Sequence, residues 1–177
     1  MRLSARVGHW LLLAALPYPL HAQAPSAQDV PKSLLPFVQS FYDWYAHAGS
    51  SLEQALKDRS SSFQPTLRRA LLADIKAQSK NPDDIVGLDV DPFLDAQDPC
   101  ERYEVGAAHQ TGHTYQVEIY GTCDGTRHAT PDVVAELAYQ HGAWVFVNFH
   151  YPRATGPEDL LGELKQLRAE RQGSSFR

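Results

Sequence analysis

Between residues 34 and 48, apolar side chains recur at the spacing of an α-helix, and most of them are large. Residues three and four positions apart share one face of a helix, and Gly49 is a typical stop. Such a face either packs against a sheet or lines a ligand cavity, and we favour packing because aromatic stripes are usually buried. The face consists of Leu34, Phe37, Val38, Phe41, Trp44, Tyr45 and Ala48.

Three further helices are predicted. A capping box starts a short helix over residues 51–59, and Pro65 suits the first turn of the next one. Asp74 lies beside the apolar face of that second helix. It is either a buried polar anchor or, as we expect, a side chain that tilts to the helix edge and stays in water. The last helix begins at Pro157 and carries leucines on one face.

The segment from Cys100 to Cys123 predicts two strands around a turn at Thr111 and Gly112. Folding the segment about this turn brings its two ends together, and these ends carry the only two cysteines of the chain. We therefore predict a disulfide across the open end of a β-hairpin.

The strand register of this hairpin involves a conflict. Folding about the turn sets Tyr103 opposite Tyr120 and Val105 opposite Glu118. The apolar pattern instead prefers Val105 opposite Val117, which shares its expected face. A one-residue bulge near the turn would satisfy both patterns.

A second hairpin is predicted from residues 133–140 and 144–151, with a turn at His141 and Gly142. The last strand is apolar on both faces, which favours a central position in the sheet. Folding at this turn pairs Tyr139 with Trp144 and Leu137 with Phe146.

The order of these elements predicts the α+β class, because the helices and strands are segregated along the chain. We expect N-terminal helices packed on a curved antiparallel sheet of about four strands, followed by a C-terminal helix. A single domain over residues 34–172 accommodates them. A strongly curved sheet around the first helix would make a cone with a cavity.

The N-terminus reads as a secretory signal peptide over residues 1–22. Arg2 and Arg6 precede an apolar stretch that is too short to span a bilayer, and cleavage follows Ala22 or, less favourably, Ala24. Residues 23–33 are expected to be a disordered lead-in. The protein is therefore predicted to be periplasmic or secreted, with no membrane span after cleavage, in a compartment that permits disulfides.

Charge narrows the class of partner. The whole chain carries a net charge of −5, and the loss of Arg2 and Arg6 with the signal peptide lowers it to −7. An acidic surface argues against nucleic acid and anionic lipid as ligands. We expect another protein as the partner, either a toxin or a cell-wall enzyme.

Three segments resemble a known family: residues 41–45 (FYDWY), residues 89–98 (DVDPFLDAQD) and residues 144–151 (WVFVNFHY). Together they are similar to the YbjP-like lipoproteins, bacterial envelope proteins whose shared domain is of unknown function. The resemblance covers about residues 34–152, and the D-P-F-x-x-A-Q-D run is its most specific part. It implies a fold similar to the cone-shaped nuclear-transport-factor-like superfamily and a binding or scaffolding role. This chain lacks a lipobox, so the resemblance implies no lipid anchor, and it implies no catalytic residue.

The acidic linker offers Asp89, Asp91 and Asp95 as ligands for a hard cation such as Ca²⁺, which prefers several converging oxygens. Pro92 follows the first two aspartates, and the glycine that a twelve-residue calcium loop needs is absent. We expect these aspartates to cap turns and to remain solvated.

His109 and His113 flank the tip of the first hairpin, where they would share a zinc or copper ion if the tip folded over. We expect exposed histidines instead. The sequence therefore predicts no metal site and no cofactor.

Trp44, Phe146, Asn148 and His150 are the candidate lining of a cavity, because the last three alternate along one strand with Trp144. In that cavity His150, facing Asp74 or Asp43, would form an acid–base pair. We prefer a core histidine and asparagine that form hydrogen bonds at a strand end.

The sequence contains no Gly-x-Ser-x-Gly elbow, no His-Glu-x-x-His motif and no phosphate-binding loop, and we assign no catalytic residue. The preferred hypothesis is an exported, non-enzymatic binding protein, most concretely an immunity-type inhibitor of an envelope-targeting toxin or hydrolase. The candidate surfaces are the hairpin tip and the acidic linker. The alternative is a small-molecule-binding or hydrolytic protein that uses the cavity.

Overall fold

Helices and strands are segregated along the chain, which confirms the α+β class predicted from the sequence. The computed structural model describes residues 30–47, 49–81, 83–152 and 158–174. The predicted signal peptide and residues 23–29 of the predicted lead-in lie outside this part. The helices are α1 (Leu34–His47), α2 (Leu52–Asp58), the 3₁₀ helix η1 (Ser60–Ser62), α3 (Pro65–Gln78) and α4 (Leu160–Ser174).

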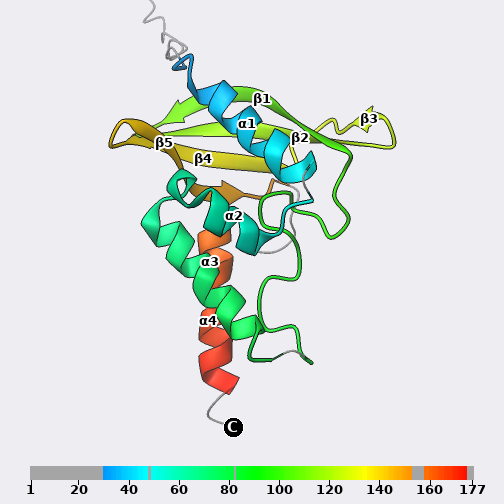
Figure 1. The fold of residues 1–177 in the computed structure, drawn as a ribbon, viewed down its shortest axis with the longest axis vertical. Helices are drawn as coiled ribbons and strands as arrows, with labels where there is room; N and C mark the ends of the chain where they lie inside the picture. Colours follow the sequence, from blue (N-terminus) through cyan, green and yellow to red (C-terminus); the bar gives the residue numbers. More distant parts are fainter. Residues whose placement is uncertain (1–29, 48, 82, 153–157, 175–177) are drawn as a thin grey trace, which may run out of the picture.

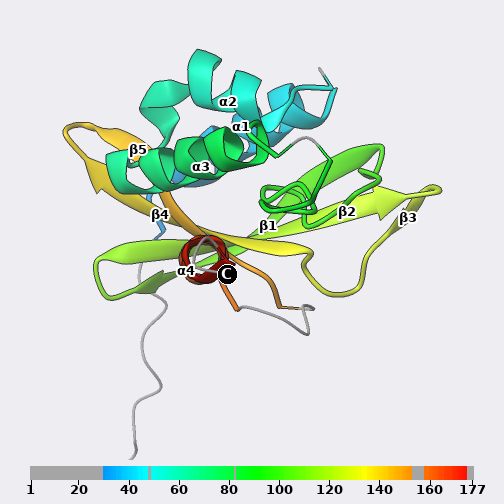
Figure 2. The same ribbon diagram turned by 90° about the horizontal axis from the view of Figure 1, so that it is seen from below.

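The strands form one antiparallel sheet that α1 crosses on one face (Figure 1). The order is β1-β2-β4-β5, and the short strand β3 pairs with the end of β2. Helices α1, α2 and α3 lie together on one side of the sheet (Figure 2), and α4 packs against α3 and β5. The strands are β1 (Arg102–Thr111), β2 (Thr114–Cys123), β3 (Thr126–Arg127), β4 (Val133–Gln140) and β5 (Ala143–His150).

The aromatic face of α1 is core, as predicted. Phe41 and Tyr45 are almost fully buried, whereas Trp44 is only partly buried at the margin of the core. The guanidinium of Arg59 lies 4.8 Å from the centroid of the Trp44 ring. Trp44 therefore marks the edge of the packed interior.

The register of the first hairpin differs from the prediction. Tyr103 pairs with Gly121, one residue beyond its predicted partner, and Val105 pairs with Ile119. Two features cause the difference: the turn lies at Gly112 and His113, one residue later than predicted, and a bulge between Val105 and Ala108 then shifts the register again. The predicted bulge exists, but it lies within β1 rather than near the turn.

The second hairpin has the predicted turn and pairing. His141 and Gly142 both have positive φ, 51° and 83°, as expected for a two-residue turn that matches the twist of its strands. The structure confirms the predicted pairs, Tyr139 with Trp144 and Leu137 with Phe146.

Strand β5 lies at the edge of the sheet, which corrects the prediction of a central strand. Isolated bridges cover its outer side: Phe63 bridges Phe146, and Asp159 bridges His150. The backbone N–H of Gln64 also donates to the carbonyl of Phe146 (2.9 Å). These flanking segments cover part of the outer edge of the strand.

The expectation that Asp74 stays in water is wrong, because the residue is 3% exposed. Its carboxylate accepts a hydrogen bond from Arg171 Nη1 on α4 (2.6 Å) and another from the backbone N–H of Leu88 (2.9 Å). Arg171 also donates to the carbonyl of Val86 (2.6 Å). Asp74 is thus the buried anchor that joins α3, the linker and α4.

The last residues of the predicted lead-in, 30–33, contact the domain. Val30 packs against the core, and Ser33 Oγ accepts a hydrogen bond from the indole nitrogen of Trp144 (3.0 Å). Within the part of the chain that the structure describes, no helix combines the length and apolar character needed to cross a membrane.

Candidate functional site

Aromatic side chains fill the space between α1 and the sheet, where the alternative prediction placed a cavity. The ring of Phe41 on α1 lies 4.8 Å from that of Phe146 on β5 and 5.6 Å from that of Phe93 in the linker. Phe93 also lies 5.3 Å from Phe63 and 4.9 Å from Phe149. Because Phe93 and Phe146 are fully buried, this interior is a packed core.

Asp91 holds Phe93 in this position. Its Oδ1 accepts hydrogen bonds from the backbone N–H groups of Phe93 (2.8 Å) and Leu94 (3.2 Å). Its Oδ2 accepts one from the hydroxyl of Tyr45 (2.5 Å). Burial raises the pKa of the Asp91 carboxyl, and these hydrogen bonds offset part of the rise. Asp91 therefore organises the loop around Phe93, which makes its role structural.

Two further tyrosines fix the backbone of the same loop. The hydroxyl of Tyr42 donates to the carbonyl of Phe93, and that of Tyr151 donates to the carbonyl of Pro92, each at 3.0 Å. Burial raises the pKa of both hydroxyls above the usual range, so they remain protonated donors. We call residues 91–94, held by these contacts, the linker plug.

The linker aspartates do not converge as a cation site would require. Asp89 accepts a hydrogen bond from Gln97 (3.2 Å), Asp91 faces the core, and Asp95 occupies the left-handed backbone region with φ of 50°. Among the described residues, one group of three His, Cys, Asp or Glu side chains is close enough to hold a metal, and it contains no linker aspartate.

The predicted cavity lining is split between the two faces of the sheet. A register shift in the β4–β5 pairing sets Leu137 opposite Phe146 but Glu136 opposite Asn148, so Val147 is an extra residue. Beyond this bulge the alternation is reversed, and Asn148 and His150 point away from the core. The prediction that they share a face with Trp144 and Phe146 is wrong.

His150 has a different partner from the expected one. Its Nε2 lies 3.0 Å from Glu136 Oε2, whereas Asp74 pairs with Arg171. Asp43, the other expected partner, accepts a hydrogen bond from the Gln39 side chain on its own helix (2.8 Å). The structure therefore contains no His150–Asp74 or His150–Asp43 pair.

Asn148 joins β5 to the start of α4. Its Nδ2 donates to Asp159 Oδ1 (2.9 Å), and its Oδ1 accepts from the backbone N–H of Leu161 (3.2 Å). Partial burial opposes ionisation of Asp159, but the hydrogen bonds from Asn148 and the Gly162 N–H lower the pKa of this carboxyl overall. Asn148 therefore has a structural role at this junction.

The outer face of the sheet carries a row of half-exposed polar side chains. We call it the polar sheet face and define it as Gln116, Glu118 and Tyr120 on β2, Glu136 on β4 and His150 on β5. Apart from His150, sequence reasoning missed these residues. The signal was present, because these three β2 residues alternate with buried Val117 and Ile119.

Contacts within this surface hold its side chains in place. Glu136 accepts a hydrogen bond from Thr114 (2.8 Å) in addition to facing His150. The hydroxyl of Tyr120 donates to Glu118 (2.9 Å), and the guanidinium of Arg127 lies 3.7 Å from the centroid of the Tyr120 ring. The hydrogen bond to Glu118 is the main cause that raises the pKa of Tyr120. These contacts order a surface that contains a carboxylate, an aromatic ring and a guanidinium.

The hairpin tip adjoins the polar sheet face. His109 is exposed, and its Nε2 lies 2.9 Å from Gln116 Oε1 across the strand pair. His113 is an exposed turn residue beside Gly112, whose φ is 61°. Neither histidine belongs to a group of three potential metal ligands among the described residues.

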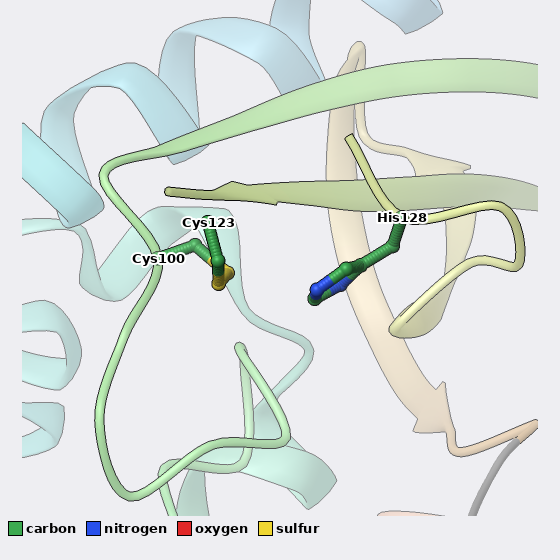
Figure 3. A group of neighbouring side chains, drawn as sticks. All are labelled: Cys100, Cys123 and His128. Atoms are coloured by element: carbon green, nitrogen blue, oxygen red, sulfur yellow. A yellow bond between two sulfur atoms is a disulfide. The ribbon is translucent and has the colours of Figure 1, made fainter. Parts of the chain in front are cut away.

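The disulfide between Cys100 and Cys123 is present, as predicted. His128 lies beside it, and its ring reaches toward the two sulfur atoms (Figure 3). Sequence analysis assigned residues 124–131 to no helix or strand. The Asp124-Gly125 dipeptide is a hairpin signal that would have predicted the fold-back placing His128 here.

The chain matches no protein-family model, no curated protein and no solved structure. The resemblance to the YbjP-like lipoproteins therefore stays a prediction.

Proposed function

We propose that the protein is an exported, non-enzymatic binding protein that recognises another protein through the polar sheet face and the adjoining hairpin tip. The observation that carries this proposal is the filled interior. Phe93 and Phe146 occupy the space between α1 and the sheet, and the residues predicted to line a cavity point in opposite directions. Recognition of a ligand therefore falls to the surface.

The polar sheet face has the composition of a recognition surface. Tyrosine and arginine are enriched among the residues that contribute most binding energy at protein interfaces. Tyr120 of this face supplies the first, and Arg127 of the adjoining β3, stacked on the Tyr120 ring, supplies the second. Their positions are held by Glu118, Glu104 and the neighbouring strands, which lowers the entropy lost when a partner binds. Helices α1 to α3 lie on the other side of the sheet (Figure 2).

The finer form of the proposal is an immunity-type inhibitor, periplasmic or secreted, of an envelope-targeting toxin or hydrolase. Charge supports it, since a chain with a net charge of −5 associates fastest with a basic partner. The resemblance to bacterial envelope proteins supports the compartment. The disulfide is compatible with export.

The test is capture of the partner by the immobilised exported protein from periplasmic and secreted extracts of the source cells and of near relatives. Mass spectrometry identifies what is retained, and binding constants are then measured with the purified partner. We expect Glu118→Lys and Tyr120→Ala each to weaken binding by at least about tenfold, because both change side chains of the polar sheet face. Inhibition of the partner's activity is the next assay.

Asp58→Lys is the matched control. It makes the same change of charge as Glu118→Lys, at an exposed position in the last turn of α2 on the opposite side of the sheet. We expect it to bind like the wild type. Equal binding by all variants would reject the polar sheet face as the interface, and failure to retain any stoichiometric protein would reject protein recognition.

A further inference from the structure

Four side chains form a cluster at the open end of the first hairpin. One ring nitrogen of His128 and the two sulfur atoms of Cys100 and Cys123 lie within 4.8 Å of one another. The same imidazole contacts Asp132, whose Oδ1 lies 2.8 Å and Oδ2 3.0 Å from Nδ1. A buried carboxylate, an imidazole and a disulfide thus stand in sequence (Figure 3 shows the last two).

The backbone builds this cluster. The chain turns back at Asp124 and Gly125, and β3 then pairs with the end of β2, which returns His128 to the side of Cys123. The backbone N–H of His128 donates to the carbonyl of Gly121 (2.9 Å), and that of Asp132 donates to the carbonyl of Ile119 (2.8 Å). The loop from 128 to 132 is therefore tied to β2 at both ends.

Gly121 lies between the disulfide and Asp132. Its N–H donates to Asp132 Oδ2 (2.6 Å). A Cβ atom at this residue would lie 2.8 Å from Cys100 Sγ and 3.2 Å from the same carboxylate oxygen. The absence of a side chain at Gly121 thus lets the disulfide and Asp132 approach one strand together.

This arrangement of side chains is suited to thiol–disulfide exchange. Attack on a disulfide releases one sulfur as a thiolate, and the reaction is faster when that thiolate is stabilised. A neighbouring imidazolium stabilises a thiolate, and a carboxylate on the far nitrogen of the ring stabilises the imidazolium and fixes its orientation. The Asp132 carboxylate lies against Nδ1, so we assign to Nε2 the role of protonating a released sulfur.

We propose that Cys100, Cys123, His128 and Asp132 form a thiol–disulfide exchange site that takes a dithiol as its reductant. The staple of the hairpin is then a reactive group as well as a structural one. The proposal stands independently of the partner suggested above for the polar sheet face.

The exchange consists of two displacements at sulfur. A thiolate of the dithiol attacks one sulfur of the disulfide, a mixed disulfide forms, and the other sulfur leaves with the electron pair of the broken bond. His128 gives its proton to that leaving thiolate and becomes neutral. The second thiol of the dithiol then gives its proton to the neutral His128 and displaces the remaining cysteine sulfur, which leaves as a thiolate and takes that proton from His128. The dithiol is oxidised to a disulfide, and Cys100 and Cys123 are reduced to thiols.

The exposure of the disulfide to solvent favours exchange in the folded protein. Both cysteines are partly exposed, and the His128 side chain is 31% exposed. The neighbours of the cysteines, Glu101 and Thr122, contribute to the lining of a surface pocket of about 420 Å³. A small dithiol or a thiol of a partner protein thus has a route to this end of the hairpin.

The charged groups at this end of the molecule are three carboxylates and the guanidiniums of Arg102 on β1 and Arg127 on β3. Asp132 belongs to the same loop as His128, Glu101 precedes β1, and Asp124 follows Cys123. Tyr103 on β1 accepts a hydrogen bond at its hydroxyl from the Cys100 N–H (3.1 Å). Among these groups, Asp132 is the one whose carboxylate forms hydrogen bonds with the His128 ring.

The experiment measures reduction of the folded, oxidised protein by dithiothreitol over a range of concentration and pH. Free thiols are alkylated at timed intervals and counted by mass spectrometry. At about pH 6, where imidazoles carry a proton, we expect His128→Asn to be reduced about tenfold more slowly than the wild type. The ratio of the two rates falls toward one as the pH rises, because a neutral imidazole no longer stabilises the thiolate.

His109→Asn is the matched control, because it removes a histidine of the same hairpin that faces Gln116 instead of the disulfide. We expect it to react like the wild type. Asp132→Asn gives a second variant in which the imidazole keeps a neighbour but loses its countercharge. Its rate of reduction should lie between those of the wild type and His128→Asn. Circular dichroism establishes that each variant is folded before its rate is compared.

The reduced protein provides a second readout. The ultraviolet absorbance of the thiolate should appear at lower pH in the wild type than in His128→Asn, a difference that a purely structural histidine would not cause. Equal rates and equal thiolate titrations in the two proteins would overturn the proposal. A reduction rate that does not rise with dithiothreitol concentration would also overturn it, because the disulfide would then react only after unfolding.

Discussion

At the scale of single residues, Asp91 shows how one carboxylate closes the core. Its two oxygens accept three hydrogen bonds, two from the backbone of the linker plug and one from Tyr45 on α1. A charged group in this place loses hydration, and burial is the main reason that its pKa is raised. The conformation of the loop therefore depends on a carboxyl that ionises less readily than an aspartate in water.

This raised pKa predicts a pH dependence of stability. The folded state holds the Asp91 proton more tightly than the unfolded state, whose Asp pKa is about 3.9. The contribution of Asp91 to the free energy of unfolding therefore increases as pH falls through the raised folded value toward about 3.9. We expect Asp91→Asn to lack this increase, which urea unfolding of both proteins at a series of pH values measures.

The comparison isolates Asp91 from other carboxyls. Glu163, whose pKa burial also raises, and Asp159, whose pKa is lowered, remain in both proteins and cancel in the difference. Parallel curves for wild type and Asp91→Asn would show that Asp91 has the same proton affinity in both states.

Local sequence did not reveal the roles of Asp74 and Asp91 for a physical reason. Their partners lie far away along the chain: Tyr45 is 46 residues from Asp91, and Arg171 is 97 residues from Asp74. A helical or turn pattern states only that an aspartate lies near an apolar face. Because most aspartates are solvated, the sequence then predicts contact with water at positions where the folded protein supplies a hydrogen-bond donor.

At the scale of elements, the bulge at Val147 decides which side chains of β5 enter the core. Phe146 and Phe149 both point inward although they are three residues apart, because Val147 is an extra residue between them. The bulge also turns Asn148 toward Asp159 and His150 toward Glu136. One inserted residue thus separates the aromatic core from the polar sheet face.

This geometry predicts an unequal effect of two deletions. Removing Val147 leaves a regular strand in which Phe146 still faces Leu137 and Asn148 still faces Glu136. Removing Val145 instead moves Phe146 to the outer face and Val147 into its place in the core. We expect the second deletion to lower the free energy of unfolding by about 2 kcal/mol more than the first. Urea unfolding of both deletion variants measures the difference.

The two variants are matched, since each lacks one valine from the same strand. Equal losses would mean that β5 does not keep the register observed on the C-terminal side of the bulge.

Turns and bulges differ in how far the sequence predicts them. The turn at His141 and Gly142 needs positive φ at two residues, and that need leaves a local signature that was read correctly. A bulge needs only one unpaired residue of any kind, so its position leaves no local signature: the pattern predicted a bulge in the first hairpin near the turn instead of within β1, and none in β5. The facing of Asn148 and His150 was mispredicted for this reason, whereas the register of the first hairpin was mispredicted mainly because its turn lies at Gly112 and His113, one residue later than expected.

At the scale of the whole molecule, segregated helices and strands were sufficient to predict the α+β class. The state of the interior was not predictable in the same way. Phe93 lies in a proline- and aspartate-rich segment that reads as a surface loop, yet it is fully buried between α1 and the sheet. A filled core and an empty cone have the same pattern of helices and strands, and a single loop residue decides between them.

The C-terminal helix is joined to the rest of the fold by a latch of the same long-range kind. Arg171 Nη1 donates to the buried carboxylate of Asp74 and to the carbonyl of Val86. Leucines 160 and 164 are buried at the other end of α4. The helix is therefore held by apolar packing near its start and by one ion pair near its end.

Loss of the latch is the prediction that tests this arrangement. Arg171→Ala leaves the carboxylate of Asp74, whose side chain is 4% exposed, without its cation, and we expect a loss of about 3 kcal/mol in the free energy of unfolding. Arg168→Ala, an exposed position one turn earlier on α4, should stay within about 0.5 kcal/mol of the wild type. Adding Asp74→Asn to Arg171→Ala should restore part of the loss, because it removes the buried charge. Urea unfolding measures all four proteins, and a loss in Arg171→Ala no greater than that in Arg168→Ala would mean that the ion pair does not hold α4.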